Sequence, residues 1–316
     1  MTIYLFFCLH HFKSTSKMNI LITGGTGMIG HRLTELLLEK GHKVSYLSRK
    51  KEKLPNVEIF QWDIQKGYIE EGALEKADYV VHLAGAGIAD KRWTDERKKE
   101  IIDSRIQPIE LINKYLQEKN IQLKGFISAS AIGIYGGDTG DLKLDESSVL
   151  GNDFLAECTK LWEIHAKKIK NAARIVSIRI GIVLSEKGGA LPKLIQPIRL
   201  GFGAALGNGK QFMSWIHVDD LCGVFVKAIE DEKMQGAYNA VAPNPVTNQE
   251  MTSVAAEVLK KPLWLPNVPS FALKLVFGEM GIVVTGGNFV MNKRLSKETN
   301  FQYKFTTIKD ALSDLL

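Results

Sequence analysis

A glycine-rich turn between an apolar strand and a helix is the feature of this chain that most restricts its fold. The letters LITGGTGMIG occupy residues 21–30. Residues 19–23 have the character of a buried strand, and the apolar residues Met28, Ile29, Leu33 and Leu37 recur at helical spacing. A strand, a turn of this kind and a helix in direct succession predict the first unit of a dinucleotide-binding sheet.

There is a physical reason for glycine at each of these positions in the turn. Gly24 and Gly25 permit a tight turn, Gly27 allows the backbone to approach a pyrophosphate, and Gly30 allows the helix to pack closely on the sheet. The free amides and the dipole of the helix N-terminus favour an anion. The alternative is a glycine-rich turn that binds nothing. We expect these residues to contact a cofactor: Thr23, Gly24, Gly25, Thr26, Gly27, Met28, Ile29 and Gly30.

Strand and helix signals alternate along the first 180 residues. Further strands are expected at residues 44–47, 57–60, 79–83, 125–130 and 175–180, and helices at residues 94–116 and 154–169. This order predicts an α/β fold, a Rossmann-type doubly wound parallel sheet. After about residue 185 the alternation fades, which predicts a smaller C-terminal substrate lobe.

The end of the second expected strand selects the cofactor. An acidic residue about 20 positions beyond the glycines would bind the ribose hydroxyls of NAD, but the chain has Ser48, Arg49, Lys50 and Lys51 there. These side chains offer a hydroxyl and cations to a 2'-phosphate, and one charge-assisted hydrogen bond of about 1.5–3 kcal/mol supports at least tenfold preference. We expect NADPH to be preferred over NADH, with Ser48, Arg49 and Lys50 as contacts. The alternative is a solvated basic turn.

The predicted domain boundaries follow from these signals. Residues 18–185 plus 214–242 are expected to form the NADP-binding Rossmann domain, and residues 186–213 plus 243–316 the smaller substrate-side lobe. Residues 1–17 are expected to be an N-terminal extension outside the fold, since Met18 directly precedes the first strand. Their apolar run lacks a basic flank and a clear cleavage site, so an appended upstream start is preferred over a short peripheral anchor.

Composition excludes several classes of protein. The net charge is +6, from 41 basic and 35 acidic residues spread along the chain, so nucleic acid is not an expected partner. The short apolar run near the N-terminus cannot span a membrane, and no membrane partner is expected. The separated residues Cys8, Cys158 and Cys222 predict no metal site and a reducing, cytoplasmic location. A small-molecule substrate and a monomer or homodimer are expected.

Several motifs resemble those of the extended short-chain dehydrogenase/reductases. Residues 23–30 match their nucleotide signature, and Asp63 lies where they place an aspartate that contacts adenine. Residues 82–87, HLAGAG, resemble the turn that follows their fourth strand along the cofactor. The resemblance implies cofactor contacts from Asp63, Leu83, Ala84 and Gly85.

Finer features are similar to one atypical branch, the epimerase family that includes the 39U-type and YfcH-like proteins. The similarity covers residues 18–316, including a small C-terminal domain, and implies nothing about the substrate. It rests on segments near residues 92–97, 153–157, 213–217, 242–247, 261–266 and 293–303.

The main departure from the parent superfamily concerns catalysis. Those enzymes use Tyr-x-x-x-Lys, in which a phenol is the general acid or base and the lysine lowers its pKa and holds the nicotinamide ribose. Lys160 is the lysine candidate, but Ala156 stands four residues earlier, and a one-residue shift pairs Leu155 with Thr159. The expected tyrosine is absent, and a positioned acid or base is worth roughly 10²- to 10⁴-fold in rate.

Substitutes for the tyrosine are available in the sequence. Glu157 can act as a base if burial raises its pKa, and it ranks slightly above Tyr135, with the thiol of Cys158 last. Each also has a non-catalytic interpretation: Glu157 as a surface glutamate, Tyr135 as a packing residue and Cys158 as a small apolar residue. Ser130, at the end of the fifth strand, is the candidate for polarising a carbonyl, and Ser128 can exchange roles with it.

Other residues near the expected cleft have structural or substrate roles. His217 is interpreted as structural, with Asp219 or Asp220 capping the following helix. Arg92, Trp93 and Arg105 are candidates for binding an anionic or aromatic substrate group, with packing as the alternative. These patterns predict an NADP-dependent oxidoreductase or epimerase acting on a small carbonyl or hydroxyl compound. The alternative is an NADP(H)-binding sensor with little turnover.

Overall fold

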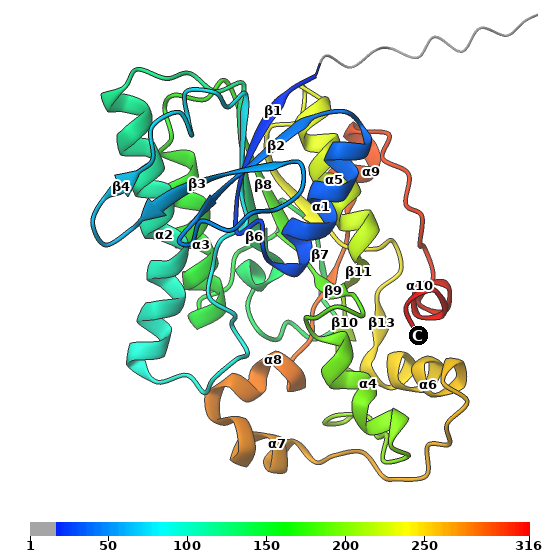
Figure 1. Ribbon diagram of the computed structural model, residues 1–316. Helices are drawn as coiled ribbons and strands as arrows, with labels where there is room; N and C mark the ends of the chain where they lie inside the picture. The colour runs from blue at the N-terminus through cyan, green and yellow to red at the C-terminus, as the bar shows by residue number, and fades with distance from the viewer. Residues whose placement is uncertain (1–16) are drawn as a thin grey trace, which may run out of the picture.

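A computed structural model of the protein describes residues 17–316 and contains one large twisted sheet (Figure 1). The expectations about the N-terminal extension and Cys8 therefore concern mainly residues 1–16, which lie outside the described residues. The strand order in the eight-stranded sheet is β12-β8-β6-β5-β1-β2-β3-β4, and only β4 is antiparallel to its neighbour. The strands are β1 (Asn19–Thr23), β2 (Lys43–Ser48), β3 (Val57–Asp63), β4 (Tyr68–Ile69), β5 (Tyr79–His82), β6 (Gly125–Ala131), β8 (Ile175–Ile180) and β12 (Gly236–Ala240).

Helices cover both faces of this sheet. On one face α1 (Met28–Glu39) packs against α5 (Val218–Glu230), and on the other α2 (Asp95–Glu118) packs against α3 (Phe154–Lys167) (Figure 1). The predicted doubly wound fold is confirmed. The central strands are nearly continuous apolar runs because both of their faces are covered, and Ile20, Leu21 and Ile22 are fully buried.

The chain leaves β1 for β2 on one side and later reaches β5 on the other side. The sheet order therefore reverses between β1 and β5, and this reversal is where α/β proteins of this kind bind ligands, beyond the carboxyl ends of the strands. Thr23, the last residue of β1, is in register with Leu47 of β2 and His82 of β5. The predicted glycine-rich turn lies at this point.

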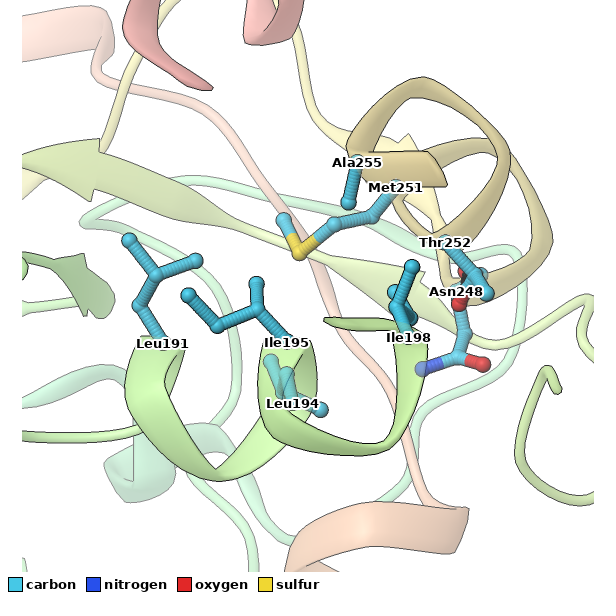
Figure 2. Close-up of a pocket in the computed structure, with 8 residues that line it drawn as sticks. All are labelled: Leu191, Leu194, Ile195, Ile198, Asn248, Met251, Thr252 and Ala255. Carbon is cyan, nitrogen blue, oxygen red and sulfur yellow. Dashed lines mark hydrogen bonds between the residues drawn. The ribbon is translucent and has the colours of Figure 1, made fainter. Parts of the chain in front are cut away.

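A second hydrophobic core lies below the carboxyl ends of the strands, where α4 (Leu191–Arg199), α6 (Asn248–Val258) and α10 (Ile308–Leu315) pack together. Leu191, Ile195 and Ile198 of α4 face Met251 and Ala255 of α6 around a narrow apolar pocket (Figure 2). The remaining helices are α7 (Ser270–Phe277), η2 (Gly278–Gly281), α8 (Ile282–Thr285), α9 (Lys293–Glu298) and η1 (Ile132–Tyr135). The smaller C-terminal lobe expected from the sequence is present.

Three short strand pairs of the described chain lie outside the large sheet. They are β7 (Lys143–Leu144) with β14 (Phe289–Val290), β9 (Ile182–Leu184) with β11 (Trp215–His217), and β10 (Phe212–Met213) with β13 (Val246–Thr247). One of them, β9 with β11, contributes buried residues to both cores. Near its C-terminus the chain packs against the large sheet again: α9 contacts β12, and Leu295 of α9 is buried in the main core. The predicted domain boundaries remain a prediction.

Candidate nucleotide-binding site and catalytic cleft

The turn after β1 is too crowded for side chains at three of its glycines. A Cβ on Gly25 would overlap the ring of the buried Tyr46. Gly24 has a φ of +72°, and a Cβ there would lie 2.9 Å from the backbone of Leu83 and Ala84. A Cβ on Gly30 would lie 2.5 Å from the carbonyl oxygen of Gly24. Gly24 therefore permits the approach of the loop after β5, and Gly30 permits α1 to pack on the turn.

The N-terminus of α1 is open to an anion. Gly27 is its N-cap residue, and within residues 17–316 no side chain caps the helix and no acidic residue stands in its first turn. A Cβ on Gly27 would meet only the Gly24 carbonyl oxygen, at 3.3 Å. By contrast, His217 caps α5, whose first turn carries two aspartates. The uncapped amides of α1 fit a pyrophosphate.

The side chain of Thr23 is engaged beneath the turn, and the cofactor contact predicted for this residue remains a prediction. Its side chain is fully buried, its Oγ1 lies 2.7 Å from Nδ1 of His82, and it accepts a hydrogen bond of 3.3 Å from the Ala84 amide. The Thr23 side chain therefore joins the ends of β1 and β5 beneath the turn. Its contribution is to position the loop that begins at Leu83.

His82 makes the stability of this junction depend on pH. Burial lowers its pKa to about 3, so His82 is neutral when folded but protonates below about pH 6.5 when unfolded. The unfolded chain then binds more protons, and this contribution to stability is lost as the pH falls from about 6.5 towards 3. Between pH 6.5 and pH 5 the expected loss is about 2 kcal/mol.

Urea unfolding at pH 7 and pH 5 tests this expectation. His82→Asn should be less stable at pH 7 but lose about 2 kcal/mol less than the wild type on acidification. The exposed His31 provides the matched control, and His31→Asn should keep the wild-type pH dependence. Equal pH dependence in all three proteins would rule out His82 as the source.

In the basic turn after β2, one cation forms an ion pair with a carboxylate and two do not. Lys51 forms a 2.7 Å ion pair with Glu70. Arg49 and Lys50 are exposed, and in the described part of the chain neither forms an ion pair with a carboxylate. The Ser48 hydroxyl accepts a 3.3 Å hydrogen bond from the Lys50 amide. Two cations beside the glycine-rich turn thus remain available to an anionic ligand.

Asp63 lies at the carboxyl end of β3, farther along the same edge of the sheet. Its carboxylate accepts a 3.1 Å hydrogen bond from the Lys66 amide, which shapes the turn after the strand. A surface pocket of about 320 Å³ begins at the next residue, Ile64. The pocket is lined by Ile64, Gln65, Gln107, Glu110, Leu111 and Lys114. The adenine contact predicted for Asp63 remains a prediction.

The loop after β5 lies against α2. A Cβ on Gly85 would approach the Arg105 guanidinium to 3.3 Å, and that guanidinium packs over the Trp162 ring at 4.9 Å from its centroid. Arg105 donates to the Ile101 carbonyl at 2.8 Å and has no carboxylate partner within residues 17–316. Burial lowers its pKa, so this charge is poorly solvated beside the loop predicted to follow the cofactor.

The hydroxyls predicted for catalysis belong to a buried polar network. Ser130 donates to Glu163 Oε1 at 2.8 Å, and Arg179 donates to both oxygens of Glu163, at 2.8 and 3.0 Å. Arg179 also donates to the Tyr135 hydroxyl at 2.9 Å, which in turn donates to Asn239 at 2.9 Å. All five side chains are buried. The phenol of Tyr135 therefore packs in the interior, and the hydroxyl of Ser130 is oriented by its hydrogen bond to Glu163.

Glu163 and Arg179 were not among the residues predicted from the sequence. A signal was present, because Arg179 is the one charged residue in the otherwise apolar strand at residues 175–180. A buried cation in such a strand requires an anionic partner. The partner is on α3, and its identity follows only from the packing of α3 against β6 and β8.

The prediction that Glu157 acts as a buried base is wrong. The condition for its use as a base was burial, but its side chain is exposed and pairs with Lys160 at 2.7 Å. Ala156, at the position of the absent tyrosine, is fully buried. Cys158 is buried as well, and burial raises the pKa of its thiol, which opposes formation of a thiolate.

Two further assignments change in the structure. His217 itself caps α5, accepting a 3.1 Å hydrogen bond from the Asp219 amide, so the predicted caps were wrong. Asp219 instead pairs with Arg32, and Asp220 accepts hydrogen bonds from the Lys304 and Phe305 amides. His217 and its neighbours thereby fasten the C-terminal segment to the nucleotide-binding core.

The two remaining substrate candidates hold the loop before α2. Arg92 donates to backbone carbonyls at the end of α7, including that of Val276 at 2.8 Å. The Trp93 indole donates to the Ile88 carbonyl at 2.8 Å, and its ring packs on Phe154. Arg92 is thus bound to the α7 backbone and Trp93 is packed, and within residues 17–316 neither Arg92 nor Arg105 forms an ion pair with a carboxylate.

The fold and the site define a class of protein. A doubly wound sheet with an open helix N-terminus at its switch point, facing a smaller lobe, is the architecture of the extended short-chain dehydrogenase/reductases. Residues 20–240 match the NAD dependent epimerase/dehydratase family, and residues 268–315 match a domain of unknown function, DUF1731. The chain belongs to the NAD dependent epimerase/dehydratase family.

Similar proteins support this assignment along the whole chain. The chain is 39% identical to the chloroplastic epimerase family protein SDR39U1 homolog of Arabidopsis thaliana, covering 96% of this chain and 88% of that protein. It is 35% identical to epimerase family protein YfhF of Bacillus subtilis, with coverages of 95% and 98%. The crystal structure of human epimerase family protein SDR39U1 with NADPH superposes with a TM-score of 0.85 at 31% identity, covering 94% of this chain and 99% of that one.

The lengths and hydropathies of the described helices show whether any of them could cross a membrane. None within residues 17–316 is both long enough and apolar enough to cross a bilayer.

Proposed function

We propose that this protein binds NADP(H), with NADPH preferred over NADH, and acts as an oxidoreductase or epimerase on a small carbonyl or hydroxyl compound. The carrying observation is the combination of an uncapped α1 N-terminus with the unpaired cations Arg49 and Lys50 at the neighbouring strand end. The human relative solved with NADPH supports the same choice.

The residues of the turn fit this cofactor. The free amides at Met28, Ile29 and Gly30 would bind the pyrophosphate, and Ser48, Arg49 and Lys50 would recognise the 2'-phosphate. Gly25, Thr26, Leu83, Ala84 and Gly85 line the path between strand ends, and Asp63 contacts adenine. A bound NADPH supplies a hydride to the substrate carbon.

Proton handling in this proposal does not use a tyrosine. Lys160 is the cation nearest the position of the absent phenol along α3, and the corresponding lysine of the parent superfamily holds the nicotinamide ribose. The 2.7 Å ion pair with Glu157 orients Lys160 on the helix surface. The Ser130 hydroxyl is held in place because it donates a hydrogen bond to Glu163. In this proposal its oxygen remains available to accept a hydrogen bond in the cleft.

A second function is favoured by a specific observation. Both candidate hydroxyls, those of Ser130 and Tyr135, already donate within the buried network. A protein that binds NADP(H) with little turnover and presents the occupied cleft to a partner would need neither. The two functions share the cofactor and differ only in turnover.

A titration with NADPH tests the cofactor proposal. Arg49→Ala should weaken NADPH binding at least about tenfold while NADH binding changes less than twofold, because only NADPH carries the 2'-phosphate. Energy transfer from tryptophan to the nicotinamide reports binding. Lys51→Ala is the matched control, since Lys51 is already paired with Glu70, and it should change NADPH binding less than Arg49→Ala does. Equal losses for the two cofactors in Arg49→Ala would contradict the preference.

Turnover separates the two functions. Oxidation of NADPH in the presence of members of a carbonyl panel supports the reductase, and Lys160→Ala should then lower kcat. Tight NADPH binding with no oxidation across the panel supports the second function.

A further inference from the structure

Two stretches of the second lobe contain no acidic residue. None occurs between Glu186 and Asp219 or between Glu257 and Glu279, although the chain has 35 acidic residues in 316. Basic residues are present in both stretches. Such a one-sided charge distribution over two separate segments creates a positive surface if the fold brings them together.

The structure does bring parts of the two stretches together. The Trp264 indole donates to the Gly201 carbonyl at 3.0 Å, and the Gly207 amide donates to the Val268 carbonyl at 2.9 Å. The chain then continues directly into α7, at the end of the molecule opposite the start of β1 (Figure 1). We call residues 199–210 together with residues 260–276 the basic apolar tip.

Large apolar side chains are exposed on this tip. Within the described part of the chain eleven large apolar side chains are exposed, and six of them are here. Phe271 and Leu275 of α7 are 75% and 78% exposed, and Trp264 is 65% exposed. The others are Leu200, Phe202 and Val276. Only Leu273 of α7 is buried, so this helix turns its apolar residues outward.

The charges of the tip are uncompensated. Its exposed cations form no ion pair within residues 17–316: they are Arg199, Lys210, Lys260, Lys261 and Lys274. The acidic residues at its border are engaged elsewhere, since Glu279 pairs with Lys98 and Glu257 pairs with Lys309. The tip therefore combines outward apolar side chains with unneutralised positive charge.

We propose that the basic apolar tip binds the surface of an anionic membrane. Aromatic and aliphatic side chains enter the boundary between headgroups and acyl chains, and surrounding cations attract anionic lipids. This contact is peripheral and requires no spanning helix. A nucleic acid backbone would satisfy the cations but would leave Phe271, Leu275 and Val276 in water.

Co-sedimentation with lipid vesicles tests the proposal. The full chain is mixed with vesicles of phosphatidylcholine alone or with about one third phosphatidylglycerol, at low and high salt. Binding should require the anionic lipid and weaken with salt. Phe271→Ser/Leu275→Ser and Lys260→Glu/Lys261→Glu should each reduce binding at least about tenfold.

Matched controls use exposed residues outside the tip. Tyr68→Ser/Ile164→Ser removes two exposed apolar side chains, and Lys168→Glu/Lys170→Glu reverses two exposed charges; both should bind vesicles as the wild type does. Unchanged thermal unfolding and NADPH binding show that each variant is folded. Absence of vesicle binding by the wild type, or equal loss in control and tip variants, overturns the proposal. A dimer that disappears only in the tip variants, without vesicle binding, assigns the tip to a second copy and also overturns it.

Discussion

Gly30→Ala is expected to lower the free energy of unfolding by about 1–3 kcal/mol and to abolish detectable NADPH binding. The added Cβ would lie 2.5 Å from the Gly24 carbonyl oxygen and 2.6 Å from the Gly25 Cα, and backbone atoms cannot rotate away as a side chain can. The helix would have to separate from the turn, which would displace the amides that face the pyrophosphate. Urea unfolding and NADPH titration measure the two effects.

Gly27→Ala is the informative counterpart. Its Cβ would lie 3.3 Å from the Gly24 carbonyl oxygen, which a small shift relieves, so the free energy of unfolding should change by less than about 1 kcal/mol. The methyl group would nevertheless occupy the space through which a phosphate approaches, and NADPH binding should weaken at least about tenfold. Wild-type affinity in a folded Gly27→Ala protein would show that this turn holds no pyrophosphate.

Glu163→Ala is expected to destabilise the protein by about 3–5 kcal/mol, because it leaves the Arg179 guanidinium buried without its anion. Both side chains are nearly inaccessible, and two hydrogen bonds join them. Burial opposes the charge on Arg179, but the hydrogen bonds and negative charge of Glu163, with help from Tyr135, outweigh it and raise its pKa. Removal of Glu163 takes away this stabilisation, but a guanidinium is not deprotonated in proteins, so Arg179 stays charged and loses its partner.

A double-mutant cycle separates the pair from its surroundings. Arg179→Met alone leaves Glu163 with only the more distant Lys167 ammonium, at 4.0 Å, and should also be costly, whereas the double variant Glu163→Ala/Arg179→Met should cost less than the sum of the two. Ser130→Ala should cost less, about 1.5–3 kcal/mol, since it removes one hydrogen bond to the carboxylate and leaves the ion pair. Additive losses in the cycle would contradict a coupled network.

This network explains why reasoning from the sequence about catalysis was incomplete. Ser130 and Tyr135 were identified as candidates because of their motif positions, and a motif does not show which way a hydroxyl is directed. Their partners, Glu163, Arg179 and Asn239, come from one helix and two strands that are distant in sequence. Glu157 failed as a buried base for a similar reason, because helical periodicity alone did not show that its face of α3 is exposed.

The sequence by itself determined the fold and the nucleotide-binding turn. These depend on local signals: apolar runs for strands, helical spacing for helices, and glycine at positions where a Cβ would contact backbone. The absence of a carboxylate after β2 is likewise visible without coordinates, as is the missing tyrosine before Lys160.

Only the tertiary structure decided which polar groups are paired and which are free. It assigned the Thr23 side chain to His82, the cap of α5 to His217, and the hydroxyls of Ser130 and Tyr135 to a buried ion pair. It also joined two acid-free segments, residues 199–210 and 260–276, into one exposed surface. The physical reason is that backbone conformation is set largely by neighbours in the chain, whereas burial, pairing and surface charge depend on contacts between residues far apart in the chain.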